Sequence, residues 1–336
     1  MAEASVSLSV IVPVYSGEAY LRPLLLRLEA VRTGWREQGA PFQLNEVILV
    51  DDSAVDGSPA LVDALAREYS WVVPLHLMRN FGQHPATIAG ILYSSGDWVV
   101  TMDEDLQHPP EDIEAMLRQA VTTGSDIVYA NPAQAVHEAA LRDWASRGSK
   151  TIMAALTGNQ NIRLFSSFRL IRGPLARAAS SVCGYETYFD VALSWYTLRV
   201  GSVKLNLKDK RFITSGKSGY NLRRLLTHAR RLLISSQVKT VRMFGALGIA
   251  VVGMSLLFFL WVVFAKTLGV SDRVPAGWAS IMGVNLFFGG FVTLLLAIVL
   301  EYLSTLVLAA NGKPIFFVVD RSADQRLVQH FLDAPT

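Results

Sequence analysis

Three consecutive acidic residues, Asp103, Glu104 and Asp105, follow a mostly apolar run that begins at Val99. Their mutual repulsion is costly in a chain with only 18% charged residues, unless a cation lies beside them. In an extended segment Asp103 and Asp105 point to one side and Glu104 to the other. Such a pair can share one Mg²⁺ or Mn²⁺ ion and leave coordination positions for the phosphates of a substrate. Because most Asp-x-Asp pairs are ordinary surface acids, the pattern needs further support.

A second acidic pair, Asp51 and Asp52, follows another apolar run in "EVILVDDSAVDGS". Ligands of open α/β sheets bind outside the carboxyl ends of the strands. The two acidic groups are therefore expected at one edge of a sheet, facing a common ligand.

The elements that must carry these acids are apolar, β-branched runs between helix-like segments, which predict a Rossmann-like parallel α/β sheet. Helical spacing begins at Leu21, and Ser58 before Pro59 is expected to cap a second helix. The predicted strands are Leu8–Val14, Glu46–Val50, Val72–Leu77, Asp97–Met102 and Asp126–Tyr129.

Composition points to a membrane part, because 51% of the 336 residues are hydrophobic and the mean hydropathy is +0.32. The uncharged runs 243–265 and 278–300 are each long enough to cross a bilayer and predict a two-helix transmembrane hairpin. A pair of buried core helices is the alternative.

Cys183 is the only cysteine, which excludes an intrachain disulfide and a thiolate zinc cluster. The first residues do not have the form of a signal peptide and are expected to lead into the first strand.

Basic residues concentrate before the first apolar run: the stretch 204–242 holds eleven Lys or Arg and one acid, Asp209. The positive-inside rule then places the large domain and the tail 304–336 in the cytoplasm. Residues 219–242 are predicted to form a basic amphipathic juxtamembrane helix on an anionic membrane surface. A basic face packed on the large domain is the alternative, and nucleic acid is disfavoured because the basic cluster leads into a membrane span.

Four motifs in this order and spacing resemble the family 2 glycosyltransferases, and more narrowly the polyprenyl-phosphate glycosyltransferases, which include dolichyl-phosphate mannose synthase and bacterial undecaprenyl-phosphate relatives. They are "LSVIVPVYSGEAYL", "VILVDDSAVDGS", "RNFGQHPATIAGI" and "GDWVVTMDEDLQHPPEDI". The resemblance covers roughly residues 6–220 and implies a GT-A type nucleotide-sugar domain over 1–218, with the two membrane helices in 243–303.

The resemblance also implies the roles on the donor side. Pro13 and Tyr15 would border the nucleotide base, and Asp52 would hydrogen-bond it. The metal on the donor diphosphate would be held by Asp103, Asp105 and Gln107. His108 is either a further ligand or a structural loop residue. The other residues expected to face the donor are Arg79, Asn80, Gln83 and Arg169, with Gly82 serving the backbone geometry.

On the acceptor side the resemblance implies cationic residues that position a lipid phosphate: Arg142, Arg169, Arg211 and Lys217. The chain departs from the family pattern at Ser167, where many relatives have Asp, and at Gly219, where the pattern has Lys. The arginine common after the fifth strand is absent from "YANPAQ". These departures concern the acceptor contacts more than the donor contacts.

The leading hypothesis is a metal-dependent, inverting transfer of one sugar from a UDP- or GDP-linked donor to polyprenyl phosphate, such as undecaprenyl or decaprenyl phosphate. The enzyme would be a multi-pass protein of the inner (plasma) membrane that makes a lipid-linked sugar for cell-envelope glycan or protein glycosylation, with no nucleic-acid partner. Homo-oligomers such as tetramers are plausible from glycines in the second apolar run. The alternatives are a catalytically silent membrane scaffold and a processive polysaccharide synthase, whose Gln-x-x-Arg-Trp segment is absent.

Overall fold

The described part of the chain contains one seven-stranded sheet, in the order β3-β2-β1-β4-β6-β5-β7. The computed structural model describes residues 5–132, 160–184, 187–205, 238–267, 277–310, 312 and 323–333. The strands are β1 (Val6–Val14), β2 (Phe42–Asp51), β3 (Val72–His76), β4 (Trp98–Thr101), β5 (Ile127–Pro132), β6 (Arg169–Arg172) and β7 (Val200–Leu205). The five predicted strands are confirmed, with shifted ends, and β6 and β7 were not predicted.

The expectation of a wholly parallel sheet is wrong at one strand. β6 runs antiparallel to both β4 and β5, while the remaining neighbours pair in parallel. The end of β6 lies beside the start of β4: the Gly173 N–H donates to the Asp97 carbonyl at 2.7 Å, and α6 begins at Gly173. The strand therefore returns beside β4 and brings Ser167 to the edge where β4 ends.

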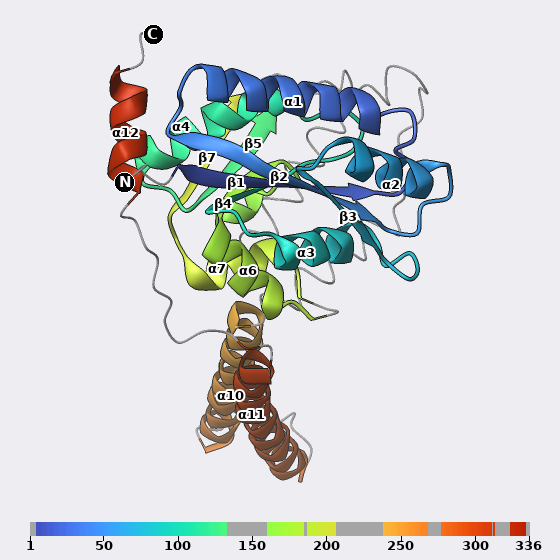
Figure 1. The fold of residues 1–336 in the computed structure, drawn as a ribbon. Helices are drawn as coiled ribbons and strands as arrows, with labels where there is room; N and C mark the ends of the chain where they lie inside the picture. Colours follow the sequence, from blue (N-terminus) through green and yellow to red (C-terminus); the bar gives the residue numbers. More distant parts are fainter. Residues whose placement is uncertain are drawn as a thin grey trace.

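Helices cover both faces of the sheet (Figure 1). One face carries α1 (Leu21–Glu37), α2 (Ser58–Glu68) and α4 (Ile113–Thr123), and the other carries α3 (Gln83–Tyr93), α6 (Gly173–Ser181) and α7 (Phe189–Tyr196). Two short 3₁₀ helices, η1 (Pro110–Asp112) and η2 (Gln160–Leu164), complete this part. Ser58 does not cap α2 as predicted. It is the first helical residue, and its hydroxyl accepts a hydrogen bond from the Gly17 N–H instead.

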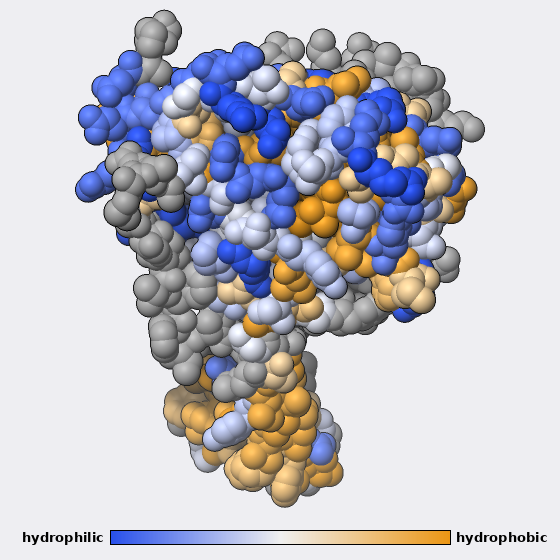
Figure 2. Space-filling view, viewed as in Figure 1, coloured by the Kyte–Doolittle hydropathy of each residue, from blue (hydrophilic) through white to orange (hydrophobic). Residues whose placement is uncertain are grey.

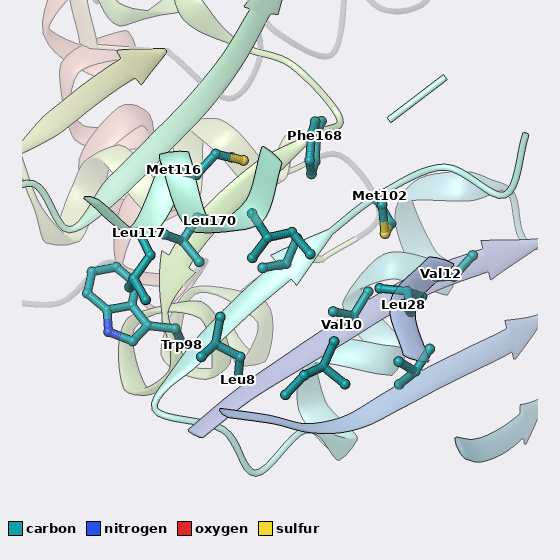
Figure 3. Close-up of a cluster of buried hydrophobic side chains, with 14 of the residues drawn as sticks. Leu8, Val10, Val12, Leu28, Trp98, Met102, Met116, Leu117, Phe168 and Leu170 are labelled. Carbon is teal, nitrogen blue, oxygen red and sulfur yellow. The ribbon is translucent and has the colours of Figure 1, made fainter. Parts of the chain in front are cut away.

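Two apolar cores fix the sheet between these layers. The larger core contains β1 and β4 residues packed on α1 and α4, including Leu8, Val10, Trp98 and Leu117 (Figure 3). On the other face α3 presses closely on β1 and β2: a Cβ added at Gly90 would lie 2.4 Å from Ile11 and 2.8 Å from Val50. The ends of β1, β2 and β4 are thereby held rigidly beside the start of α3.

Two long helices, α10 (Val238–Thr267) and α11 (Trp278–Ala310), extend from the side of the domain that α3, α6 and α7 cover (Figure 1). Among the described residues one segment, Ile281–Leu303 of α11, is long and apolar enough to cross a bilayer, and α10 holds the shorter apolar stretch Ile249–Ala265. Figure 2 shows apolar residues over their surface. The helices themselves agree with the predicted runs, whereas a membrane crossing by both stays a prediction, and the amphipathic segment lies mostly outside the described residues.

Glycines of α11 allow this helix to approach α10. A Cβ at Gly283 would lie 2.5 Å from Phe259, and one at Gly290 would lie 3.2 Å from Val252. Gly289 has no such neighbour within 4 Å. Packing within the chain thus accounts for two of the three glycines, and the expected homo-oligomer stays a prediction.

The tail, predicted only as a cytoplasmic extension, contains a helix that returns to the domain. α12 (Asp324–Asp333) lies beside α4, on the face opposite α3 (Figure 1). Leu327 and Phe331 are buried in the larger core, and Phe331 stacks on Phe42 with 5.6 Å between ring centroids. Asp324 forms an ion pair with Arg172 at 2.5 Å. The C-terminal helix is therefore part of the same folded unit as the N-terminal strands.

Candidate active site

A cavity of about 1300 Å³ opens at the carboxyl ends of β1, β2 and β4. Its lining brings together most of the donor-side residues predicted from the sequence: Pro13, Tyr15, Asp52, Asn80, Gln83, Asp103, Asp105 and Arg169. Gln107 contacts Asp105 behind this wall. Residues more than 150 positions apart in the chain thus share one site, as expected for the edge of an α/β sheet.

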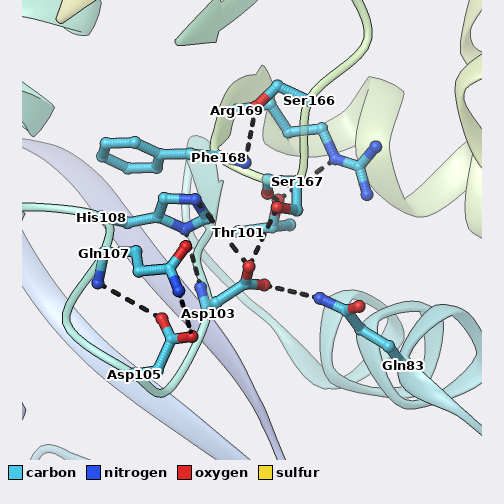
Figure 4. A network of polar contacts seen from close by, with 10 residues as sticks. All are labelled: Gln83, Thr101, Asp103, Asp105, Gln107, His108, Ser166, Ser167, Phe168 and Arg169. Carbon is cyan, nitrogen blue, oxygen red and sulfur yellow. Dashed lines mark hydrogen bonds and ion pairs between the residues drawn. The ribbon is translucent and has the colours of Figure 1, made fainter. Parts of the chain in front are cut away.

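Asp103 is held from two sides (Figure 4). The Gln83 side chain, at the first residue of α3, donates to Asp103 Oδ1 at 2.6 Å. The Ser167 hydroxyl, just before β6, donates to Asp103 Oδ2 at 3.1 Å. Neutral donors fix the orientation of this carboxylate without placing a counter-charge beside it. The role of Asp103 as a metal ligand stays a prediction.

Asp105 is buried and is oriented by Gln107, whose side-chain amide donates to Asp105 Oδ2 at 2.9 Å (Figure 4). Glu104 contacts the loop after β1. It accepts hydrogen bonds from the Tyr15 and Ser16 N–H groups at 3.0 Å and 3.2 Å. Glu104 thus fixes this loop, and all three acids line the cavity.

The contacts of His108 favour the structural role among the two alternatives that the sequence left open, and its role stays a prediction. Its Nδ1 accepts a hydrogen bond from the Asp103 N–H at 2.9 Å, and its ring stacks on Phe168 at 4.8 Å. Burial lowers the pKa of His108, and the nearby charges of Asp103 and Asp105 oppose this only in part. A neutral imidazole that already uses Nδ1 supports the acidic loop from behind.

Asp52 organises the loop between β3 and α3. Its two carboxylate oxygens accept hydrogen bonds from the Phe81 and Gly82 N–H groups, at 2.7 Å and 2.8 Å. Gly82 has φ of +97°, which confirms that this position needs glycine for its backbone geometry. Since each carboxylate oxygen has two lone pairs, these bonds leave capacity for the predicted contact with a base.

Arg169 lies at the floor of the cavity and pairs with Asp190 of α7. Its Nε also donates to the Thr101 hydroxyl at 3.1 Å, and the Tyr129 hydroxyl donates to Asp190 at 2.8 Å. Burial alone would lower the pKa of Arg169, but the adjacent Asp190 reverses this and raises it. The charge of this arginine is thus balanced inside the protein.

Comparison with known proteins identifies the family. The model of "Glycosyl transferase family 2" matches residues 9–178, half of the chain. The protein is a family 2 glycosyltransferase. It is 31% identical to the undecaprenyl-phosphate 4-deoxy-4-formamido-L-arabinose transferase of Pseudomonas aeruginosa, over 92% of this chain and 88% of that protein. An Aeromonas hydrophila transferase of the same name is 27% identical over 92% of both chains.

Among solved structures, the glycosyltransferase is similar to glucosyl-3-phosphoglycerate synthase from Mycobacterium tuberculosis in complex with UDP. The TM-score is 0.47 and the identity 16%, over 71% of this chain and 82% of that one. The family match begins within β1, extends past the end of β6 and includes the whole acidic loop. It favours the enzyme interpretation over the silent scaffold that the sequence left open.

Three predicted acceptor residues of the glycosyltransferase, Arg142, Arg211 and Lys217, lie outside the described residues. Several described residues that line the cavity were not predicted as site residues, among them Asp190 and Ser167. Asp190 is the lone charge in "YFDVALSWY", and such an acid in an apolar helix signals a buried partner. Ser167 stood out only as a departure from the family pattern, and its bond to Asp103 depends on the antiparallel β6.

The donor set at the cavity fits a hard divalent cation. Asp103 and Asp105 offer carboxylate oxygens, the ligands that Mg²⁺ and Mn²⁺ prefer. Within the described part of the chain, no three His, Cys, Asp or Glu side chains gather as a metal site. Mg²⁺ commonly binds through one or two carboxylates and completes its shell with water and substrate phosphates.

Proposed function

We propose that this glycosyltransferase moves one sugar from a UDP- or GDP-linked donor to a polyprenyl phosphate, undecaprenyl phosphate above all, at the cytoplasmic face of the membrane. The observation that carries the proposal is the shared cavity, in which the Asp103 and Asp105 carboxylates lie beside the loop that Asp52 organises. The relatives named above act on undecaprenyl phosphate by name, and they match nearly the full length of the chain.

On the donor side, Asp103 and Asp105 would hold Mg²⁺ or Mn²⁺, with Gln107 fixing Asp105. The ion supplies charge neutralisation for the departing nucleoside diphosphate. Pro13, Tyr15 and Asp52 form the end of the cavity that would receive the base. Asn80, in the loop before α3, and Gln83, the first residue of α3, also line the cavity and would face the donor.

On the acceptor side, a lipid phosphate is already anionic and needs no strong general base for its attack on the anomeric carbon. It needs positioning by cations, the role proposed for Arg142, Arg211 and Lys217. Arg169 is better suited to support the cavity floor, because Asp190 already neutralises it. A single displacement of this kind inverts the anomeric configuration.

The return of α12 supports a hairpin that enters and leaves the membrane on one side. Phe331 and Leu327 of α12 are built into the core that β1 and α1 also form. Both ends of the α10–α11 pair therefore connect to the same folded domain. The number of crossings must be even, and two crossings match the two helices and the basic segment that precedes them.

The decisive experiment combines the purified protein with Mg²⁺ or Mn²⁺, polyprenyl phosphate and a panel of UDP- and GDP-sugars. We expect a lipid-linked monosaccharide and released nucleoside diphosphate with one of these donors. Asp105→Ala should lose at least about a hundredfold in turnover, together with metal-dependent donor binding. Asp333→Ala, at an exposed acid on α12, is the matched control and should keep full activity. Failure to form any glycolipid with the whole panel would refute the proposal.

A further inference from the structure

The cavity continues past the carboxylates to an aromatic wall that the proposed donor and acceptor roles do not use. His84 of α3 and Tyr188, just before α7, meet edge to face with ring centroids 4.7 Å apart. Phe165 stacks on Tyr188 at 6.2 Å. All three side chains line the cavity, and all are half-buried. Their exposed ring surface therefore faces the same space as Asp103.

This aromatic wall, His84, Phe165 and Tyr188, is backed by buried groups. Phe165 packs on Tyr129 at 5.6 Å, and the Tyr129 hydroxyl donates to Asp190 at 2.8 Å. Asp190 is in turn paired with Arg169. A wall supported by a buried ion pair changes its shape little on binding, so the ordering cost of a contact against it is low.

The strand order locates the wall relative to a bound donor. The proposed base end lies at β1 and β2, the carboxylates follow β4, and the segment leading into β6 carries Phe165. A nucleotide sugar is a linear sequence of base, ribose, diphosphate and sugar. With its base at β1 and β2 and its diphosphate at Asp103, its sugar must extend toward β6, where the aromatic wall stands.

We propose that the aromatic wall is the subsite of the transferred sugar, which stacks the C–H face of its ring on Tyr188. This inference rests on the proposed function and adds the part of the donor that these residues recognise. Aromatic rings bind such weakly polar C–H surfaces through dispersion and through their negative π face. Ser166, which also lines the cavity, offers a hydroxyl to the sugar's polar edge.

The charges around the wall narrow the class of sugar. Five carboxylates line the described part of the cavity: Asp52, Asp103, Glu104, Asp105 and Asp190. The one described arginine among the lining residues, Arg169, is already paired with Asp190. Among the described lining residues, no arginine or lysine is therefore left to pair with the carboxylate of a uronate. The subsite is suited to a sugar that needs no such partner, such as a neutral or N-acylated one.

An isoprenoid chain is the competing occupant of an aromatic surface. Ser166 lines the cavity and is half-buried, and a hydrocarbon against it would remove its hydroxyl from water without offering a hydrogen bond. A sugar ring presents both an apolar face and hydroxyls, which matches this mixture. If a sugar occupies the wall, substitution of Tyr188 should weaken binding of the donor. If an isoprenoid chain occupies it, the same substitution should weaken binding of the acceptor.

The test compares the affinity of the nucleotide sugar with that of its nucleoside diphosphate, measured by calorimetry with Mn²⁺ on the full chain. Tyr188→Ala should weaken the nucleotide sugar about tenfold and leave the nucleoside diphosphate unchanged. Tyr188→Phe, which keeps the ring, should bind both ligands like the wild type. Tyr93→Ala, at an exposed tyrosine at the far end of α3, is the control and should change the affinity for neither ligand.

UDP-glucuronate should bind at least tenfold more weakly than UDP-N-acetylglucosamine if UDP is the nucleotide used.

Several results would overturn the inference. Equal weakening of both ligands by Tyr188→Ala would mean that the wall only supports the fold, and the unchanged nucleoside diphosphate affinity checks that the variant is folded. A rise in the KM of polyprenyl phosphate with normal donor affinity would assign the wall to the lipid. Unchanged binding of the nucleotide sugar would refute this subsite alone, whereas a wild type that binds no nucleotide sugar would refute the proposed function as well.

Discussion

Asp103 illustrates how much a single carboxylate depends on its neutral neighbours. Both of its oxygens accept hydrogen bonds, from the Gln83 amide and the Ser167 hydroxyl. A small displacement of a side chain in an active site can lower the reaction rate strongly, because the reacting groups must be held in a narrow geometry. The side chains that position Asp103 should therefore affect the reaction without touching the substrate's reacting atoms.

Replacing Gln83 by Ala should raise the concentration of Mg²⁺ needed for half-maximal activity and lower the turnover about tenfold, since a hydrogen bond to a charged group is worth about 1.5–3 kcal/mol. The measurement is initial rate against Mg²⁺ concentration. Gln38→Ala, at an exposed glutamine after α1, serves as the control and should behave like the wild type. Equal metal dependence in both variants would show that Gln83 does not position Asp103.

His76 predicts a pH dependence of stability near the base end of the cavity. Its Nδ1 lies 2.9 Å from Asp51 and its Nε2 lies 3.1 Å from Asp63. The hydrogen bond to Asp51 raises the pKa of His76 above its usual value near 6.5, against the opposing effect of burial. The protonated ring therefore stabilises the fold fully below about pH 6.5, and this contribution is lost as the pH rises through the raised pKa.

The measurement is the Tm of the wild type and of His76→Gln at about pH 6 and about pH 9. The wild type should be the more stable at the lower pH, and the difference should shrink at the higher pH. We expect a shift of only a few degrees, because the imidazole is 39% exposed and such pairs contribute about 1 kcal/mol or less. A difference that stays constant between the two pH values would contradict the ion-pair interpretation.

At the residue scale, the sequence could predict ligand types but not their partners. An acidic run after an apolar strand indicates a cation, and alternation predicts that Glu104 points away from Asp103 and Asp105. Glu104 does bond to the loop after β1, but all three acids line the cavity. Ser167 reaches Asp103 across 64 positions of the chain, and no local pattern reports such a contact. Arg169 was predicted to contact the substrate because the sequence does not show that Asp190 lies against it.

At the scale of the element, α3 must approach the sheet closely to place Gln83 and His84. Gly90 permits that approach, since a Cβ there would lie 2.4 Å from Ile11. Gly90→Ala should destabilise the protein by about 1–3 kcal/mol through overpacking. Gly34→Ala, in α1 with no neighbouring atom within 4 Å, should stabilise it by about 0.5–1 kcal/mol. Thermal unfolding of both variants is the measurement, and a stabilising Gly90→Ala would contradict the packing.

Elements were predictable where burial leaves a continuous apolar run. β1, β2 and β4 are buried along most of their length, so their sequences are apolar runs that predict strands. β6 has four residues, two of them arginines, and is buried because Arg169 and Arg172 find acidic partners in the fold. α12 is a short helix far from the domain in sequence, and only Leu327 and Phe331 of its residues are buried. Such elements depend on tertiary contacts that a single sequence does not reveal.

For the whole molecule, α12 joins the end of the chain to its beginning. Asp324 pairs with Arg172, whose guanidinium also lies over Trp98 at 4.6 Å, and Phe331 stacks on Phe42. Because α12 follows α10 and α11 in the chain, the core of the domain can be completed only after both helices have been synthesised. The proposed transmembrane hairpin, with both ends connected to one domain, would place a lipid phosphate at a defined depth relative to the cavity.

This arrangement predicts which parts of the chain are reachable from each side of the membrane. Cys183 is the only native cysteine, and burial raises the pKa of its thiol to about 12. A Cys183→Ser background has no cysteine left to label, and we expect it to stay folded. Into it we would place Ser271→Cys between α10 and α11, and Leu332→Cys on α12, where Leu332 is 73% exposed. Gln38→Cys marks the catalytic domain.

A membrane-impermeant maleimide should label Ser271→Cys in right-side-out vesicles, and Leu332→Cys together with Gln38→Cys in inside-out vesicles. Detergent should make all three reactive, which controls for local accessibility. Labelling of Leu332→Cys on the side opposite Gln38→Cys would mean an odd number of crossings, which a helix docked beside α4 cannot have. Labelling of all three variants from the cytoplasmic side would mean that α10 and α11 do not cross. The α12 contacts permit that result, but the proposed hairpin does not.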